Sequence, residues 1–415
     1  MGCTHAGTPL QSWFDSRRRA QGSTRDRRHP SARRPRTTSR CDESDEAGIM
    51  CLPDETIPAE AILGVFDLVD TESHESVHFG VDHKSGLRSI IAIHDTTLGP
   101  ALGGTRFYPY ASEDEALVDV LRLSKGMTYK AACAGLDQGG GKAVIIGDPS
   151  ELRSDDLFLA YGRFVDSLGG TYITAEDVGT TVSDMAIVRQ VTDHVSGLPM
   201  EMGGSGDPSP ATARGVVSAI EAVSEHLWDT DELAGRRIAI KGIGKVGFSL
   251  AERLHRRGVE LVVADINTSA TDRAASDLGA KVISVDDIHA VDCDIFAPCA
   301  LGADFNAVTI PQLACSAIAG SANNQLATPA DGIRLKDAGI TYVPDFVANA
   351  GGIINIASGE GGYSTEKAIA MIDRIRSTVA NILTKAVELD IDTHAAAVLV
   401  ADERIAAAKQ QEETP

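Results

Sequence analysis

At 415 residues the chain is too long for one ordinary domain, and its 43% share of hydrophobic residues is that of a globular protein. No apolar run approaches the roughly 18 residues of a membrane-spanning helix, so the sequence predicts no membrane partner. The formal net charge of −21 at pH 7 argues against nucleic-acid binding by the folded part.

The charge is unevenly distributed along the chain. Residues 1–40 contain ten Arg and two Asp, whereas the remaining 375 residues contain 28 basic and 57 acidic side chains. We interpret residues 1–55 as a disordered or mis-annotated extension. A nucleic-acid-binding basic tail and an organelle transit peptide are the alternatives for its basic part. The acidic remainder is typical of a halophilic protein, whose self-repulsion is screened by salt.

The seven cysteines form no CxxC pair and no spacing suited to zinc. We therefore expect reduced thiols in a cytoplasmic protein, with neither a metal site nor a disulfide framework. These cysteines are Cys3, Cys41, Cys51, Cys133, Cys293, Cys299 and Cys315.

The first half of the chain begins with strand patterns. Residues 76–95 predict two strands joined at "DHKSG". The segment "LGPALGGTRFYPY", residues 98–110, predicts a glycine-rich loop or bend. Further on, "KAVII" at 142–146 and "TYIT" at 171–174 predict two short strands, and the second leads into "AEDVGTT".

A helix is predicted between these strands. Ser112 and Glu115 have the spacing of a capping box. Apolar residues then recur at helical spacing, namely Ala116, Val120, Leu123 and Met127. Lys130 falls within about 40–60° of this stripe and Lys125 falls opposite it. Lys125 is therefore expected to be a solvated surface charge, whereas Lys130 on the buried side requires an anionic partner.

The second half begins after a boundary at about 200–210, which is dense in Gly, Pro and Ser. A helix at about 211–227 leads into "RRIAIKGIGKVGFSLAERLHRRGVELVVADIN", residues 236–267. Gly242, Gly244 and Gly247 form G-x-G-x-x-G between a strand and a helix, and Asp265 ends the next strand.

This arrangement predicts a dinucleotide site. The glycines allow a tight turn and close backbone approach, and the helix N-terminus offers N–H groups to a pyrophosphate. Asp265 would accept hydrogen bonds from the ribose hydroxyls and repel a 2′-phosphate, which favours NAD over NADP. A glycine turn in a domain that binds nothing is the alternative. Strands at "AKVIS", "CDIFAPC", "SAIAGSA" and "ITYVPDF" complete a doubly wound sheet, whose loops at Ala300 and Asn323–Asn324 should line the cofactor crevice.

A second group of residues, upstream of the glycine turn, suggests catalysis. Lys130 and the backbone N–H groups of Gly103 and Gly104 could hold a carboxylate. Lys142, crowded by Lys130 and partly desolvated, would have a lowered pKa and could act as a general base. Asp177 could carry protons to and from an amino group. Surface lysines and a capping Asp are the alternative.

Six segments resemble the Glu/Leu/Phe/Val amino-acid dehydrogenase family, and among its members the leucine and valine dehydrogenases most closely. These segments are "LGPALGGTR", "KGMTYKAACAGLDQGGGKAVIIGDP", "TAEDVGTT", "APCALGA", "IAGSANNQL" and "PDFVANAGGIINIA". The resemblance covers about residues 60–400. It implies a two-domain α/β fold, with a substrate and oligomerisation domain at 56–205 plus 355–415 and a Rossmann NAD domain at 206–354. It also implies a homo-oligomer.

Residue roles follow from the resemblance position by position. Lys142 would activate water, Asp177 would handle the proton of the amine, and Lys130 would bind the substrate carboxylate. The other expected substrate-binding residues are Leu102, Gly103, Gly104, Ala175, Asn324, Ile353 and Ile356. The expected cofactor-binding residues are Thr212, Gly242, Gly244, Lys245, Val246, Gly247, Asp265, Ala300 and Asn323. No metal is expected.

The resemblance implies reversible oxidative deamination of an L-amino acid to a 2-oxo acid and ammonia. By family alignment, the side-chain pocket is formed by Leu102, Ala175, Ile353 and Ile356, which cannot pair with a γ-carboxylate. A branched aliphatic substrate is therefore favoured, and the sequence does not rank leucine, valine and isoleucine. A phenylalanine or glutamate dehydrogenase of the same family, or a non-catalytic NAD-binding regulator, is the alternative.

Overall fold

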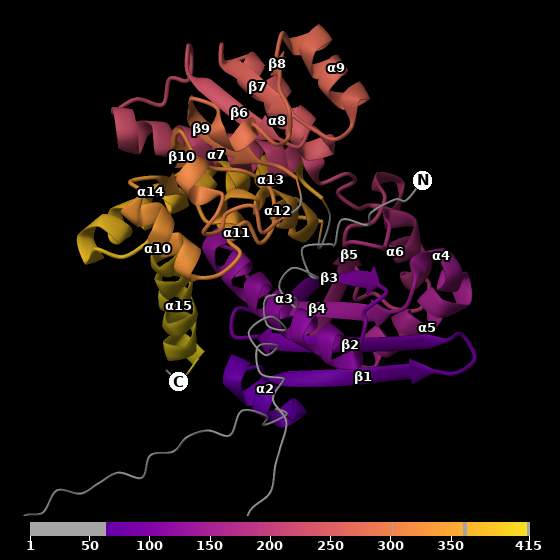
Figure 1. Cartoon of the computed structure of the whole chain (residues 1–415). Coiled ribbons are helices and arrows are strands. Elements are labelled where there is room, and N and C mark those ends of the chain that lie inside the picture. Colours follow the sequence, from indigo (N-terminus) through magenta and orange to yellow (C-terminus); the bar gives the residue numbers. More distant parts are fainter. Residues whose placement is uncertain (1–63, 301, 360–362, 413–415) are drawn as a thin grey trace, which may run out of the picture. The chain divides into compact units, whose positions relative to one another are not determined.

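The computed structural model describes residues 64–300, 302–359 and 363–412 (Figure 1). The expected N-terminal extension, residues 1–55, lies outside the described residues. From Asp67 onward the chain forms one compact unit, and its described residues build two β-sheets.

The first sheet has the strand order β1-β2-β4-β3-β5. Its strands are β1 (Ser76–Asp82), β2 (Leu87–Asp95), β3 (Ala101–Tyr108), β4 (Gly139–Ile146) and β5 (Tyr172–Glu176). β1 and β2 form the predicted antiparallel hairpin, and β2 also runs antiparallel to β4. β3 lies between β4 and β5 and is parallel to both. The carboxyl ends of β3, β4 and β5 therefore lie at the same edge of the sheet.

The prediction of a loop at 98–110 is wrong, because β3 occupies the interior of the sheet. Glycine is required there for close packing rather than for a turn. A Cβ on Gly103 would lie 1.7 Å from the carbonyl oxygen of Gly141, and one on Gly104 would lie 2.5 Å from that of Glu176. Glycine-rich sequence therefore marks close backbone approach within a strand.

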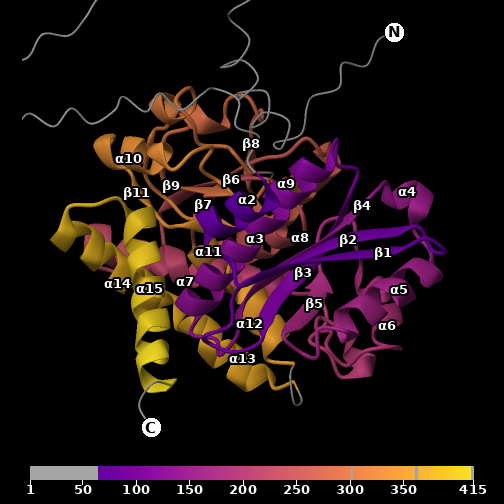
Figure 2. The same cartoon turned by 90° about the horizontal axis from the view of Figure 1, so that it is seen from below.

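Helices cover both faces of the first sheet (Figure 2). α3 (Glu113–Ala134) packs on β2 and β4, whereas α5 (Asp155–Asp166) and α6 (Val182–Val188) pack on strands of the same sheet within a second apolar core. The remaining helices of this part are α2 (Val65–Glu72) and α4 (Pro149–Leu152), and a 3-10 turn follows at Met200–Met202. The predicted helix is confirmed as α3, and Ser112 caps it by accepting from the Glu115 N–H. The capping box is only half formed, because the Glu115 carboxylate accepts from Ala111 rather than from Ser112. Lys130 therefore lies in the last turns of a long, capped helix.

The second sheet is a parallel, doubly wound sheet, as predicted. Its order is β11-β10-β9-β6-β7-β8. Its strands are β6 (Arg237–Lys241), β7 (Glu260–Ala264), β8 (Lys281–Val282), β9 (Cys293–Pro298), β10 (Cys315–Ile318) and β11 (Thr341–Tyr342). The strand order reverses direction between β6 and β9, which is where open α/β sheets bind ligands.

Helices surround the second sheet and lead back toward the first. The helices around the sheet are α7 (Ser209–Trp228), α8 (Lys245–His255), α9 (Thr268–Leu278) and α10 (Ala330–Asp337), with 3-10 turns at Ile288–Ala290 and Ile310–Gln312. The C-terminal helices are α11 (Asp345–Ala348), α12 (Gly351–Ala357), α13 (Thr365–Asp373), α14 (Ile375–Leu389) and α15 (Thr393–Glu412). None of the described helices is long and apolar enough to cross a membrane.

The last helix holds the end of α3 in place. α15 packs against α3 and α14 (Figure 1). The Arg404 guanidinium donates to the carbonyl oxygens of Ala131 and Ala132 and pairs with Asp137. These two oxygens also accept from the backbone N–H groups of Leu136 and Gly135, so Arg404 adds a second donor to each carbonyl at the end of α3. One apolar core also runs continuously from α3 through α7 and α14 to the second sheet, so the helix that carries Lys130 is tied to the dinucleotide-type fold.

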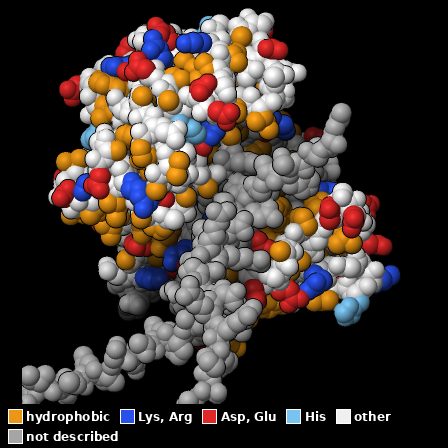
Figure 3. Space-filling view, in the orientation of Figure 1, with side chains coloured by type: hydrophobic (Ala, Val, Ile, Leu, Met, Phe, Trp, Pro, Cys, Tyr) orange, Lys and Arg blue, Asp and Glu red, His pale blue; other side chains and the backbone are white. Residues whose placement is uncertain are grey.

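The molecular surface mixes both signs of charge. Acidic and basic side chains are interspersed with apolar ones over the face seen in Figure 3.

Candidate functional site

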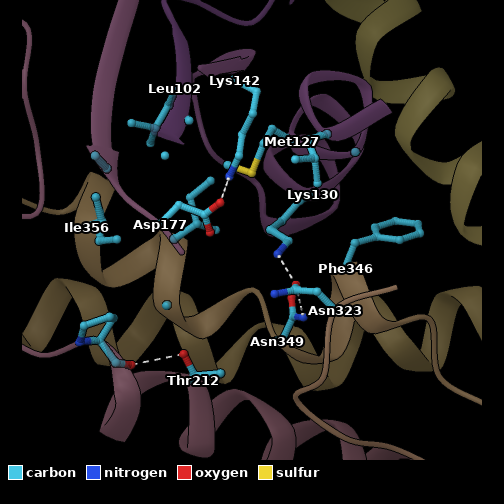
Figure 4. Close-up of a pocket in the computed structure, with 18 of the residues that line it drawn as sticks. Leu102, Met127, Lys130, Lys142, Asp177, Thr212, Asn323, Phe346, Asn349 and Ile356 are labelled. Carbon is cyan, nitrogen blue, oxygen red and sulfur yellow. Dashed lines mark hydrogen bonds and ion pairs between the residues drawn. The ribbon is translucent and has the colours of Figure 1, made fainter. Parts of the chain in front are cut away.

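A cavity of about 330 Å³ is lined by residues from β3, β4 and β5 of the first sheet, from α3, α7, α8, α11 and α12, and from the segment that follows β10 (Figure 4). It brings together the predicted catalytic and substrate-binding residues Leu102, Gly103, Gly104, Lys130, Lys142, Ala175, Asp177, Asn324, Ile353 and Ile356. Of the predicted cofactor residues, Thr212, Val246 and Asn323 also line it. Gly242, Gly244, Lys245, Gly247, Asp265 and Ala300 do not.

Lys142 and Asp177 form an ion pair at this cavity. The Lys142 Nζ atom lies 2.9 Å from Asp177 Oδ2, and the Lys142 side chain is only 7% exposed. Lys142 is the fourth residue of β4, on the face that packs against α3, and Asp177 directly follows β5. Lys142 therefore lies inside the strand and is not its first residue, because β4 begins at Gly139 and the predicted strand began at residue 142. In Figure 4 its side chain extends toward Asp177.

The electrostatics of this pair involve a residue that the sequence reasoning missed. Burial lowers the pKa of Lys142, the Asp177 charge opposes this, and the Arg106 charge lowers the pKa further. Arg106, and not Lys130 as predicted, is therefore the main cation acting on Lys142. Burial also opposes ionisation of Asp177, but Lys142 and Arg106 outweigh it and hold the Asp177 pKa well below its usual range.

Lys130 enters the same cavity from α3. Its Nζ atom lies 3.3 Å from the side-chain oxygen of Asn323, which also accepts from the Asn349 amide at 2.8 Å. Burial lowers the pKa of Lys130 to about 8; Asp345 opposes this shift and Lys142 adds to it. In Figure 4 the side chains of Lys130 and Lys142 approach the cavity from the same side. A ligand with one negative charge would meet the cation of Lys130, whereas the charge of Lys142 is already paired with Asp177.

The remaining wall of the cavity is largely apolar. The four predicted pocket residues, Leu102, Ala175, Ile353 and Ile356, are joined by Met127 and Phe346. Leu102 and Ala175 are buried at 1% and 4% exposure. Transfer of an aliphatic side chain from water to such a wall is favourable, whereas a second carboxylate would lack a partner on it.

The glycine turn has the geometry that a dinucleotide requires. Gly242 has φ +99°, and a Cβ there would lie 2.7 Å from the backbone nitrogen of Ala300. A Cβ on Gly247 would lie 2.0 Å from the Gly242 carbonyl oxygen, so the third glycine lets α8 pack closely on the turn. A Cβ on Gly244 would meet nothing within 4 Å, and Gly244 begins α8 without a side-chain cap. The first N–H groups of α8 therefore suit a pyrophosphate.

The other predicted cofactor residues lie around this turn. Asp265 accepts from the backbone N–H of Ile243 through Oδ2 at 2.6 Å and from that of Asn267 through Oδ1 at 2.7 Å. Lys245 pairs with Asp207 at 3.7 Å and is largely exposed. The Thr212 hydroxyl donates to the Pro208 carbonyl oxygen at 3.1 Å. The residues present thus fit a dinucleotide placed between the turn and the cavity.

Sequence reasoning missed several cavity residues. Arg106 ended the quoted "LGGTR", and Asn349 lies in "VANAGG"; both are polar residues within motifs that were already recognised. Asp119 does not line the cavity but pairs with Arg106, and it gave a signal of its own, because it is an acid on the apolar side of a predicted helix and is 3% exposed. The described residues contain no group of three or more His, Cys, Asp or Glu side chains suited to a metal ion.

Two family models match the chain. One, described as Glu/Leu/Phe/Val dehydrogenase, dimerisation domain, matches residues 72–194. The other, described as Glutamate/Leucine/Phenylalanine/Valine dehydrogenase, matches residues 203–274 and 263–412. Together these matches span most of the described chain.

Individual relatives agree with these matches. A leucine dehydrogenase of Geobacillus stearothermophilus is 50% identical over 82% of this chain and 93% of the relative. A valine dehydrogenase of Streptomyces coelicolor is 46% identical over 85% of this chain and 97% of the relative. The crystal structure of L-tryptophan dehydrogenase from Nostoc punctiforme has 44% identity and a TM-score of 0.75, over 83% of this chain and 99% of that one.

Proposed function

Because the chain belongs to the Glu/Leu/Phe/Val dehydrogenase family, we propose that it catalyses the reversible, NAD-dependent oxidative deamination of a branched-chain aliphatic L-amino acid. The products are the 2-oxo acid and ammonia. The observation that carries this proposal is one cavity in which Lys130, Lys142 and Asp177 meet an apolar wall. The identity to leucine and valine dehydrogenases over most of the chain supports the same reaction.

Lys130 and Asn323 would bind and orient the substrate. Lys130 is charged below its pKa of about 8 and would hold the α-carboxylate as an ion pair. Asn323 already accepts from Lys130 and Asn349, which fixes its amide at the cavity wall. The backbone of Gly103 and Gly104 would support the same carboxylate, because no side chain shields it.

Asp177 and Lys142 would move the protons. Asp177 accepts a proton from the substrate ammonium, so that the nitrogen lone pair becomes available. Bound NAD supplies the acceptor for the hydride that leaves Cα. Lys142, in its neutral form, takes a proton from water as the water adds to the iminium carbon, which gives a carbinolamine. Asp177 then returns a proton to the nitrogen, the C–N bond breaks to release ammonia, and the hydroxyl proton passes to solvent as the 2-oxo acid forms. The lowered pKa of Lys142 increases the neutral fraction that this step needs.

The cavity wall would choose the side chain. Leu102, Ala175, Ile353 and Ile356 present only apolar atoms, so glutamate would leave its γ-carboxylate without a partner. Leucine, valine and isoleucine differ by one methylene or its position, which a hydrophobic pocket discriminates by only about 1–3 kcal/mol. All three are therefore substrates under this proposal.

The glycine turn would hold the cofactor, with the pyrophosphate at the N-terminus of α8. Asp265 lies beside the turn and would receive the ribose hydroxyls. Its charge opposes the 2′-phosphate of NADP, which makes NAD the proposed cofactor. Ala300 and Val246 would flank the part of the bound dinucleotide that lies between the glycine turn and the cavity.

Three further properties belong to this proposal. The first sheet with the C-terminal helices forms the substrate and oligomerisation domain, and the second sheet forms the NAD domain. The protein is a cytoplasmic homo-oligomer, as the dimerisation-domain match suggests, and light scattering at a monomer mass of 43.7 kDa would contradict this. The acidic chain is halophilic, so its melting temperature rises in molar KCl; a falling melting temperature contradicts that.

An NADH absorbance assay of the full chain tests the function. We expect turnover of L-leucine, L-valine and L-isoleucine with NAD, and at least about tenfold lower kcat/KM with NADP. L-phenylalanine, L-tryptophan and L-glutamate are the comparison substrates, because a relative of 44% identity is a tryptophan dehydrogenase. Higher kcat/KM for an aromatic acid overturns the substrate assignment. NAD binding without turnover of any amino acid instead favours the regulator.

A further inference from the structure

The side chain of Arg106 lies between two carboxylates at the back of the cavity. Its Nε atom lies 3.2 Å from Asp177 Oδ2, and its Nη1 atom lies 2.8 Å from Asp119 Oδ2. The side chain is 13% exposed and also lines the cavity. Arg106 therefore connects the proposed proton carrier to a second acid that does not reach the substrate space.

That second acid is firmly held. The Asp119 side chain is 2% exposed, and its Oδ2 atom also accepts from the Tyr110 hydroxyl at 2.8 Å. Its Oδ1 atom accepts from Arg122 at 3.0 Å. A buried carboxylate with three donors has little freedom to rotate, so it fixes the guanidinium that it binds. Arg106 is thus clamped from α3 while its other edge faces Asp177.

Both cations that contact Asp177 use the same oxygen. Lys142 and Arg106 lie 2.9 Å and 3.2 Å from Oδ2. The carboxylate also accepts from the Val178 backbone N–H. Both cations therefore fix the carboxylate through Oδ2, whereas a substrate amino group would approach it at Oδ1.

We propose that Arg106 is a positioning residue for the deamination: it holds the Asp177 carboxylate by Oδ2, with Asp119 as its anchor, so that Asp177 and Lys142 face the reacting carbon together. This inference rests on the proposed function. It adds an arginine and an acid to the two residues that carry the protons: Arg106 acts through Asp177, and Asp119, which does not line the cavity, acts through Arg106.

A second consequence concerns which group loses a proton. A guanidinium is not deprotonated in proteins, so Arg106 keeps its charge throughout the reaction. Of the two cations on Asp177, only Lys142 can become neutral, and the fixed charge of Arg106 favours that outcome. Arg106 also keeps Asp177 paired after Lys142 has lost its charge. A neutral residue in place of Arg106 should therefore raise the pKa of Lys142.

The test compares Arg106→Met and Arg106→Lys with the unchanged protein. Met removes the charge at similar length, and Lys keeps the charge but cannot bridge both acids. We expect kcat for L-leucine to fall at least about 100-fold in Arg106→Met and about tenfold in Arg106→Lys, with KM changed less than about threefold. The acid limb of the kcat profile should move to higher pH by about one unit in Arg106→Met and stay near its original position in Arg106→Lys.

A second measurement requires no turnover. Reductive methylation of Lys142 by formaldehyde, followed by peptide mass spectrometry across pH, reports the fraction of neutral amine. We expect the midpoint of Lys142 labelling to rise by about one pH unit in Arg106→Met. If no amino acid is turned over by the unchanged protein, the proposed function fails, while this measurement still decides whether Arg106 controls Lys142.

Arg236→Met is the matched control. Arg236 pairs with Asp294 at 3.3 Å, its side chain is 26% exposed against 13% for Arg106, and it does not line the cavity. It should leave kcat and both pH profiles unchanged. The proposal is overturned if Arg106→Met keeps kcat within about threefold, or if kcat falls while the Lys142 midpoint and the acid limb do not move. If Arg106→Met does not fold, a normal kcat in Arg106→Lys overturns it.

Discussion

Two lysines are paired with aspartates in the interior, one in each sheet. Lys142 in β4 pairs with Asp177, and Lys241 at the end of β6 pairs with Asp304. Each aspartate also contacts a second basic side chain through the same oxygen, Arg106 in the first sheet and His289 in the second. We refer to these groups as the first-sheet cluster (Lys142, Asp177, Arg106) and the second-sheet cluster (Lys241, Asp304, His289).

The two clusters differ in what they face. All three members of the first-sheet cluster line the cavity, and no member of the second-sheet cluster does. In the second-sheet cluster the His289 ring stacks on Phe296 and the Asp304 side chain is 8% exposed. Burial opposes ionisation of Asp304, but His289 and Lys241 outweigh it and lower its pKa. A buried ion pair therefore indicates chemistry only where it also has access to a ligand.

Lys142→Met should give the largest loss of activity. We expect kcat for L-leucine to fall at least about 10³-fold, because Lys142 is the group that takes the proton from water in the proposed reaction. The chain should still fold, since Asp177 keeps its contact with Arg106. Stopped-flow measurement of NADH formation gives the rate, and NADH fluorescence confirms that the cofactor still binds. If kcat of Lys142→Met stays within about tenfold of that of the unchanged protein, Lys142 is not a catalytic residue, and the two clusters do not differ in function.

Lys241→Met should give the largest loss of stability. We expect the free energy of unfolding to fall by about 3 kcal/mol, because Asp304 would keep its charge in the interior with only His289 beside it. The double variant Lys241→Met/Asp304→Leu should recover most of that loss. Urea unfolding followed by circular dichroism measures both changes.

The rate is the control for the second-sheet cluster. The double variant should keep kcat within about twofold, since its residues do not line the cavity. A folded double variant that has lost turnover would show that the second-sheet cluster takes part in function. The corresponding pair Lys142→Met/Asp177→Leu should not recover turnover under any condition.

The smallest effect concerns Lys130 and pH. Lys130 is charged below its pKa of about 8 and neutral above it. Affinity for the 2-oxo acid, which has no amine of its own to titrate, should therefore fall above about pH 8, toward tenfold per unit. Lys130→Arg keeps its charge and should remove this decline. Titration of 4-methyl-2-oxopentanoate in the presence of NADH measures this affinity at each pH. An equal decline in Lys130→Arg and in the unchanged protein would contradict the role of Lys130.

Local pattern predicted much of the fold. The second sheet follows from strand, glycine turn and helix signals that lie within about 30 residues, as the geometry of Gly242, Gly244 and Gly247 confirms. The strand β3 was misjudged because glycine usually marks turns. Only its neighbours β4 and β5, which lie elsewhere in the sequence, show that Gly103 and Gly104 are required for close packing.

The residues of the candidate site that could be predicted are those that lie in a recognisable sequence motif. Lys130, Lys142 and Asp177 lie in such motifs and do line one cavity. The contact between Arg106 and Asp119 joins β3 to α3, and neither segment contains a sequence pattern that predicts this pairing. The sequence suggested that Lys130 is the cation that lowers the pKa of Lys142, because the two lysines lie close together in the chain. In the structure Arg106 has this role, because the pairing of β3 with β4 and β5 brings Arg106 and Lys142 to the same carboxylate, that of Asp177.

The bare backbone at Gly103 limits how this pocket can change. A side chain of any size there would collide with the Gly141 carbonyl, so one wall of the pocket is fixed by the peptide chain itself. New substrate ranges, in nature or in the laboratory, have to come from the walls that do carry side chains. Leu102, Ala175, Ile353 and Ile356 are therefore the positions at which a library should be varied, while the carboxylate end stays the same for every amino acid that enters.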